Sequence, residues 1–210
     1  MIGILTQQLD PSFDDDPRFK GYDSYLMAAY VKFMEAAGAR VVPLILGEPE
    51  EVTMDKISKL DGVLFPGGDG DYIEMGGKII TKIMEYNDNG HFYPVWGTCL
   101  GYESMMIWAS SVGRDIWEPY SAHAISETLQ FVVDPRETKM FGDLGDKAFK
   151  FETEAMTLNS HKWGVDPVKF ITDDGLASIY KLTSISYEPE GEHRPFAASV
   201  EGKKYPFFGT

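Results

Sequence analysis

The segment at residues 92–111 reads Phe-Tyr-Pro-Val-Trp-Gly-Thr-Cys-Leu-Gly-Tyr-Glu-Ser-Met-Met-Ile-Trp-Ala-Ser-Ser. It predicts an apolar strand, a sharp turn at residues 97–101 and then a helix. The turn holds Cys99, the single cysteine among the 210 residues. A nucleophile elbow needs small residues beside the reactive one because the strand and helix backbones approach closely there, and Gly97 and Gly101 supply them. We therefore interpret Cys99 as a nucleophile, the alternative being a buried structural cysteine.

The position of Cys99 also offers a way to activate its thiol. A helix N-terminus favours the thiolate through its dipole and its unpaired N–H groups. The backbone N–H of Leu100 is expected to act as one oxyanion donor. A second donor is expected from the glycine loop that follows Phe65. The alternative is that this loop is only a tight turn. This loop does not match the spacing of dinucleotide or phosphate loops.

Composition restricts the class of protein. The chain has 43% hydrophobic and 25% charged residues, as is ordinary for a soluble globular protein, and a formal charge of −14. That charge argues against nucleic acid and anionic membranes as partners. A single cysteine excludes an internal disulfide and a multi-cysteine zinc site. Because residues 2–5 already read as a core strand, we expect no leader in this sequence, which leaves a cytosolic protein or a removed leader as alternatives.

The first half of the chain alternates strands and helices. We predict strands at residues 2–5, 40–46, 62–65 and before Cys99, and helices at residues 22–37, 50–60 and from 73 to near 90. The first helix has Asp23 or Ser24 as its candidate N-cap and one continuous buried stripe. The pattern predicts an α/β fold with a doubly wound, mostly parallel central sheet flanked by helices on both faces. Both glycine loops then lie at carboxyl ends of strands, where ligands bind.

Beyond Gly113 the pattern changes to short segments separated by turns. Residues 128–133, 149–153, 182–187 and 195–200 are predicted as antiparallel strands appended to the sheet. With no repeat or linker visible, we expect a single domain over residues 1–210. The aspartate run at residues 14–16 is interpreted as a solvated loop rather than a metal site, and we expect no metal and no organic cofactor.

A cysteine nucleophile usually works with a histidine base. His161 follows a strand-like run, in a predicted loop with an aromatic residue and a cation, and is our candidate for the active-site cleft. His123 and His193 lie in polar stretches and are expected at the surface. His91 precedes the nucleophile strand, at the wrong end for catalysis.

The sequence Val-Trp-Gly-Thr-Cys-Leu-Gly-Tyr-Glu at residues 95–103 closely resembles the nucleophile segment of gamma-glutamyl hydrolases, within the class I glutamine amidotransferase-like superfamily. Supporting matches run along the chain, at residues 2–5, 25–32, 36–43, 62–68, 161–163 and 201–206. The resemblance implies cysteine-dependent removal of glutamate from folate poly-gamma-glutamates through a thioester. It also implies a small-molecule substrate, a homodimer, and a lysosomal, vacuolar or secreted location.

The same resemblance assigns roles to residues of this chain. Cys99 is implied as the nucleophile, and His161 as a second catalytic-site residue in or beside the cleft. Gly68 and Leu100 are implied as the oxyanion donors. The residues implied in substrate binding are Tyr25, Gly67, Glu103, Lys162 and Trp163.

One departure from the family pattern concerns the catalytic base. The resemblance implies a His-Pro-Glu segment shortly after residue 206, and none of the four histidines occupies that place. We therefore expect that the chain lacks the C-terminal end of its domain. The alternatives are a natural pseudoenzyme that serves as a structural component of a larger assembly, or an ammonia-supplying glutaminase that works with a synthase.

Overall fold

The computed structural model describes residues 1–9, 13, 16–68, 70, 72–189 and 192–210. Two members of the aspartate run, Asp14 and Asp15, lie outside the described residues. The chain forms two compact units, Met1–Ser104 and Met105–Thr210, each described below by itself. No helix among the described residues combines the length and apolar character needed to cross a bilayer.

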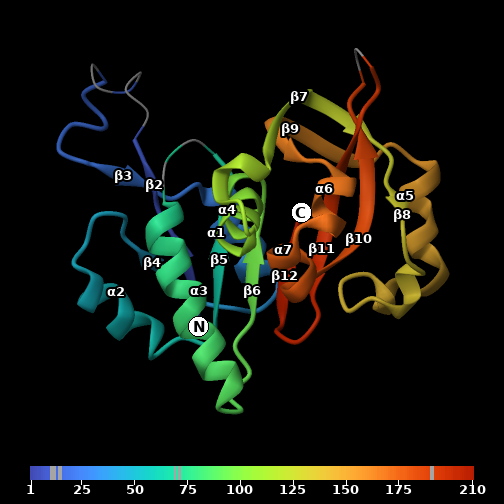
Figure 1. The fold of residues 1–210 in the computed structure, drawn as a ribbon. Helices are drawn as coiled ribbons and strands as arrows, with labels where there is room; N and C mark the ends of the chain where they lie inside the picture. Colours follow the sequence, from blue (N-terminus) through green and yellow to red (C-terminus); the bar gives the residue numbers. More distant parts are fainter. Residues whose placement is uncertain (10–12, 14–15, 69, 71, 190–191) are drawn as a thin grey trace. The chain divides into compact units, whose positions relative to one another are not determined.

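The first unit is built on parallel strands joined by helices (Figure 1). Along the chain its elements are β1 (Ile2–Leu5), β2 (Gln7–Gln8), β3 (Ser24–Tyr25), α1 (Ala28–Ala36), β4 (Val41–Leu44), α2 (Glu50–Ile57), β5 (Gly62–Phe65), α3 (Ile73–Asp88), β6 (Val95–Gly97) and the start of α4 (Leu100–Ala109). Its sheet has the order β4-β1-β5-β6. All four residues of β5 are buried, which requires that both faces of the sheet are covered.

The predicted helix over residues 22–37 is wrong in its first half. α1 begins only at Ala28, because the segment before it forms β3 and pairs antiparallel with β2. The N-cap is Met27, and neither Asp23 nor Ser24 takes that role. No residue of α1 is fully buried, so the predicted buried stripe is only partly covered. Backbone pairing between distant residues overrides the helical spacing here, and a periodicity analysis cannot detect such pairing.

The second unit is antiparallel (Figure 1). Its elements are the end of α4, the short 3-10 segments η2 (Gly113–Ile116), η3 (Pro135–Glu137) and η4 (Gly142–Phe149), β7 (Trp117–Glu127), β8 (Gln130–Phe131), α5 (Lys150–Thr153), β9 (Thr157–Val165), α6 (Pro167–Thr172), α7 (Asp174–Ile179), β10 (Tyr180–Tyr187), β11 (Pro195–Gly202) and β12 (Phe207–Gly209). The strands β12, β11, β10 and β8 pair in that order, and β7 and β9 form a separate ribbon.

Most predicted strands of the second half are present, with one error and one omission. The segments at 182–187 and 195–200 lie within β10 and β11, and the segment at 128–133 is reduced to β8. The segment at 149–153 is helical instead, because Phe151 packs into a cluster formed by Leu129, Phe141 and Ala148. The β7–β9 ribbon was not predicted. Parallel strands with intervening helices and appended antiparallel strands confirm the predicted fold class.

Candidate active site

Cys99 occupies a strained turn between β6 and α4. Its φ is +51°, a left-handed conformation that a residue with a side chain adopts at a cost of about 1–3 kcal/mol. The turn is held by backbone bonds from the Gly101 N–H to the Thr98 carbonyl at 2.9 Å and from the Glu103 N–H to the Cys99 carbonyl at 2.8 Å. The side chain of Cys99 is half-buried. A strained, accessible side chain at a strand-to-helix corner is the geometry of a nucleophile elbow.

The elbow lies directly against the end of β5. This close contact explains why the residue two positions after Cys99 is a glycine, Gly101. A Cβ atom at Gly101 would lie 2.0 Å from the carbonyl oxygen of Phe65, so no side chain fits there. The Thr98 N–H donates to that same carbonyl at 3.0 Å. The backbone contact that we predicted from the glycine spacing is therefore present at Gly101.

The loop after β5 reaches the nucleophile. A Cβ atom at Gly67 would lie 2.8 Å from the Cβ of Cys99, so the Cys99 side chain lies on that face of the glycine. Gly68 has φ +136°, a conformation that favours glycine. The two glycine loops thus come together at the carboxyl ends of adjacent parallel strands, as their positions in the sequence predict.

Three side chains from separate elements hold this loop. The Tyr72 hydroxyl, just before α3, donates to the Pro66 carbonyl. The Tyr30 hydroxyl, on α1, accepts from the Gly67 N–H at 2.7 Å. The Gln7 Nε2, on β2, donates to the Gly67 carbonyl at 2.5 Å. We call these three side chains the loop clamp.

The two tyrosines of the clamp stay protonated at physiological pH. Burial raises the pKa of Tyr30, and the nearby ionisable groups of Cys99 and Tyr25 raise it further. Burial also places the pKa of Tyr72 well above its ordinary value. The Tyr72 hydroxyl therefore keeps the proton that it donates. The charges that Tyr25 and Cys99 can carry both act on the Tyr30 hydroxyl.

Glu103 lies in the first turn of α4 and is only 7% exposed. Burial raises the pKa of its carboxyl group from 4.5 to about 7. A buried carboxyl group with a pKa near neutrality can be a hydrogen-bond donor below that pH and an acceptor above it.

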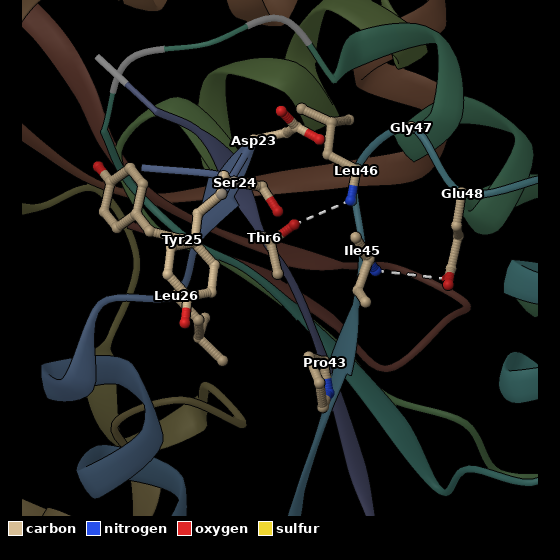
Figure 2. Close-up of a pocket in the computed structure, with 12 residues that line it drawn as sticks. Thr6, Asp23, Ser24, Tyr25, Leu26, Pro43, Ile45, Leu46, Gly47 and Glu48 are labelled. Carbon is tan, nitrogen blue, oxygen red and sulfur yellow. Dashed lines mark hydrogen bonds between the residues drawn. The ribbon is translucent and has the colours of Figure 1, made fainter. Parts of the chain in front are cut away.

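Tyr25 lines a pocket of ≈ 490 Å³ at the carboxyl ends of β1 and β4. Figure 2 shows Tyr25 and Leu26 on one side, Ile45 and Leu46 on the other, and Thr6 between them. The Leu46 N–H donates to Thr6 Oγ1 at 2.8 Å, a bond that joins the chain just after β1 to the chain just after β4 (Figure 2). Its lining combines the apolar Leu26, Pro43, Ile45 and Leu46 with tyrosine side chains and with the polar Thr6, Asp23, Ser24 and Glu48.

His161 lies in the second unit, on β9, and not in a loop as predicted. Its Nδ1 is 2.8 Å from the Trp163 carbonyl, which can only accept, so Nδ1 carries the proton and Nε2 does not. Its ring contacts Phe196 edge-on at 4.7 Å, and burial lowers its pKa. Lys162 and Trp163 are exposed on the same strand. His123 and His193 are exposed, as predicted.

The first unit thus contains six of the predicted site residues, namely Cys99, Leu100, Gly67, Gly68, Glu103 and Tyr25. His161, Lys162 and Trp163 belong to the second unit. No site role was assigned from the sequence to any of the three clamp residues, Gln7, Tyr30 and Tyr72. Gln7 follows β1 at its carboxyl end, and that position was the available signal.

Comparisons with known proteins agree with these features. The sequence model of the family described as Peptidase C26 matches residues 1–74. "Gamma-glutamyl hydrolase 1" of Arabidopsis thaliana is 37% identical over 191 residues, which cover 89% of this chain and 54% of that protein. "Gamma-glutamyl hydrolase" of Rattus norvegicus is 32% identical over 216 residues, covering 100% of this chain and 65% of the relative. The chain therefore spans a little over half to about two thirds of the length of these relatives.

A solved structure supports the fold alone. It is described as part of a putative GMP synthase from Thermoplasma acidophilum, with a TM-score of 0.56 and 13% sequence identity. The similarity covers 100% of this chain and 81% of that protein. The α/β fold class predicted from the alternation of strands and helices is thus confirmed by an independent structure.

The sequence relatives confirm the resemblance predicted from the nucleophile segment at residues 95–103. Over most of its length this chain is similar in sequence to gamma-glutamyl hydrolases, and its first 74 residues match the model of the Peptidase C26 family.

Proposed function

We propose that this chain carries the nucleophile of a cysteine-dependent hydrolase that cleaves gamma-glutamyl bonds in folate poly-gamma-glutamates through a thioester. The observation that carries the proposal is the contact between Cys99, in its strained elbow, and Gly67 of the neighbouring glycine loop. The names of its sequence relatives support the class of bond, because they are gamma-glutamyl hydrolases.

The proposed reaction begins at the thiol. The Cys99 thiolate attacks the gamma-amide carbonyl carbon, and the carbonyl π electrons move to oxygen, which the N–H groups of Leu100 and Gly68 stabilise. Collapse of this intermediate breaks the C–N bond, and the leaving amine takes a proton. Water then attacks the thioester, releases the gamma-carboxylate and returns the thiol. The N-terminus of α4 next to Cys99 favours the thiolate needed for the first step.

We assign substrate binding to groups around the thiol. Gly67 lies against Cys99, and we assign to it a contact with the scissile amide. Tyr25 lines the pocket in Figure 2, and we assign to it a contact with the substrate. Glu103 provides a buried carboxyl group that is neutral below pH 7 and can donate to a substrate carboxylate.

From the resemblance we also propose that His161 is a second residue in or beside the substrate cleft. Its unprotonated Nε2 can accept a proton, and its lowered pKa keeps it neutral near pH 7. We further propose that Lys162 and Trp163, both exposed on the same strand, contact the anionic and aromatic parts of the substrate. A homodimer and a lysosomal, vacuolar or secreted location are proposed from the resemblance alone.

The experiment compares the full-length protein with its Cys99→Ala and Cys99→Ser variants. Glutamate release from pteroyl-poly-gamma-glutamate should fall by at least about 10³-fold in both, because the nucleophile is lost. Unfolding temperatures should stay close to the wild type, since the side chain is small and half-buried. Mass spectrometry of the acid-quenched wild type should detect an acyl group on Cys99. Wild-type rates in Cys99→Ala would refute the proposal, and ammonia release from free glutamine would favour a glutaminase.

A further inference from the structure

Gln7 is buried beside the glycine loop, yet the proposed reaction does not use it. Its side chain is 1% exposed and its Nε2 donates to the Gly67 carbonyl at 2.5 Å. Among the described residues, its Oε1 has no hydrogen-bond partner. A buried acceptor without a partner opposes folding.

The orientation of this amide follows from its partner. A carbonyl oxygen can only accept, so the nitrogen of the Gln7 amide must face Gly67 and the oxygen must face away. Rotation of the amide would place two oxygens against each other. The bond to the Gly67 carbonyl therefore fixes the Gln7 side chain and leaves Oε1 unpartnered.

The same bond fixes the direction of the Gly68 N–H. The Gly67 carbonyl and the Gly68 N–H belong to one planar peptide unit, and in a trans peptide they point in opposite directions. None of the described peptide bonds is cis. Anchoring the carbonyl toward Gln7 thus turns the Gly68 N–H to the opposite side. Gly68 also packs closely against the Gln7 amide. A Cβ atom at Gly68 would be 2.2 Å from Gln7 Nε2, so no side chain fits between them.

We propose that Gln7 is a positioning residue for the oxyanion site: by holding the Gly67 carbonyl, its amide presents the Gly68 N–H to the developing oxyanion. This inference rests on the proposed function, in which Gly68 supplies that donor. Gln7 itself does not touch the reacting atoms. Because Gln7 sets the orientation of one peptide unit, it affects the rate of the chemical step, kcat, and not the binding of the substrate.

The test uses Gln7→Met in the full-length protein, a substitution of similar shape without the amide. Misorienting one oxyanion donor should lower kcat for pteroyl-poly-gamma-glutamate by about 10- to 100-fold, with KM changed less than about threefold. The alkylation rate of Cys99 by iodoacetamide should stay within about twofold of the wild type, since that reaction forms no oxyanion. Gln8→Met, at the exposed neighbouring position, is the matched control and should leave all three quantities unchanged.

A second variant keeps the test decisive if Gln7→Met folds poorly. In Gln7→Glu the introduced carboxyl group can donate to the Gly67 carbonyl only while it is protonated. Its kcat should therefore approach the wild-type value at low pH and fall further below it as the pH rises.

Three outcomes overturn the inference. The first is a kcat within twofold of the wild type in Gln7→Met, and the second is a parallel loss of kcat, Cys99 alkylation and unfolding temperature, which indicates a merely structural role. The third is a pH profile of Gln7→Glu that matches the wild type. In each case the proposed function stands if Cys99→Ala has lost its hydrolase activity. If Cys99→Ala keeps that activity, both the proposed function and the inference about Gln7 are refuted.

Discussion

Replacing Glu103 with glutamine removes a buried ionisable group while keeping its size. Glu103 is 7% exposed, and burial raises its pKa from 4.5 to about 7. The folded protein therefore holds a proton on this group over a pH range in which the unfolded chain has lost it. Glutamine stays neutral at every pH, so the variant lacks this difference between the two states.

The sign and size of the effect follow from proton linkage. Below pH 4.5 the carboxyl group is protonated in both states, so its burial carries no charge penalty. Between pH 4.5 and about 7 the folded state binds more protons than the unfolded state, so the free energy of unfolding falls as the pH rises. At 1.36 kcal/mol for each tenfold change in proton affinity, the total loss is about 3 kcal/mol. Glu103→Gln should thus match the wild type near pH 4.5 and be about 3 kcal/mol more stable at pH 8.

The assay is urea unfolding of both proteins at a series of pH values from 4.5 to 8, at equal ionic strength. Glu35→Gln, at an exposed position of α1, controls for the loss of one acidic residue. A stability difference between Glu103→Gln and the wild type that stays constant within about 1 kcal/mol over the series would refute the reasoning. It would mean that water or a hydrogen-bonding partner stabilises the ionised carboxylate, so that burial does not raise its pKa.

Three further predictions concern single residues. Gly101→Ala should lose about 1–3 kcal/mol of stability or more in urea unfolding, because the new methyl group meets the Phe65 carbonyl. Its control is Gly76→Ala in α3, where the nearest atom to the new methyl group lies at 3.8 Å, and this variant should be neutral or gain up to about 1 kcal/mol. Although burial opposes it, hydrogen bonds from backbone N–H groups and serine hydroxyls lower the pKa of Asp173 to about 2. Asp173→Asn should therefore cost about 2 kcal/mol at pH 7, a difference that disappears as the pH falls from 3.8 through about 2. Burial lowers the pKa of His161 from 6.5, so the wild type should lose stability relative to His161→Gln as the pH falls below 6.5, and an unchanged difference between pH 8 and 5 would contradict this.

The parts of the fold that were predicted correctly have local signals. β5 (Gly62–Phe65) is a short apolar run that ends at Pro66, and α3 begins after the glycine loop and ends near the predicted position. The elbow was predicted from glycine spacing, and its contact with Phe65 follows directly from that spacing. In these cases the residues that decide the structure lie within a few positions of one another.

The errors have a common physical cause, which is pairing or packing between distant residues. β3 forms because its backbone pairs with β2, and Phe151 is helical because its ring packs against Phe141 and Leu129. The β7–β9 ribbon was missed since much of its surface is exposed and gives a weak apolar alternation. The contact between Gln7 and the loop was missed for the same reason, because Gln7 is 60 residues from Gly67 in sequence. Tyr72 is only six residues from Pro66, and its contact depends on the path of the loop between them.

The loop clamp bears on any attempt to transplant this chemistry into another protein. The elbow at residues 97–101 is a contiguous segment that could be grafted onto a foreign parallel sheet. The shape of the facing loop, however, is imposed by side chains that come from β2, α1 and the segment before α3. A recipient would need all three donors and acceptors at matching heights above its sheet, so a transferred thiol alone would yield an alkylatable cysteine and not a hydrolase.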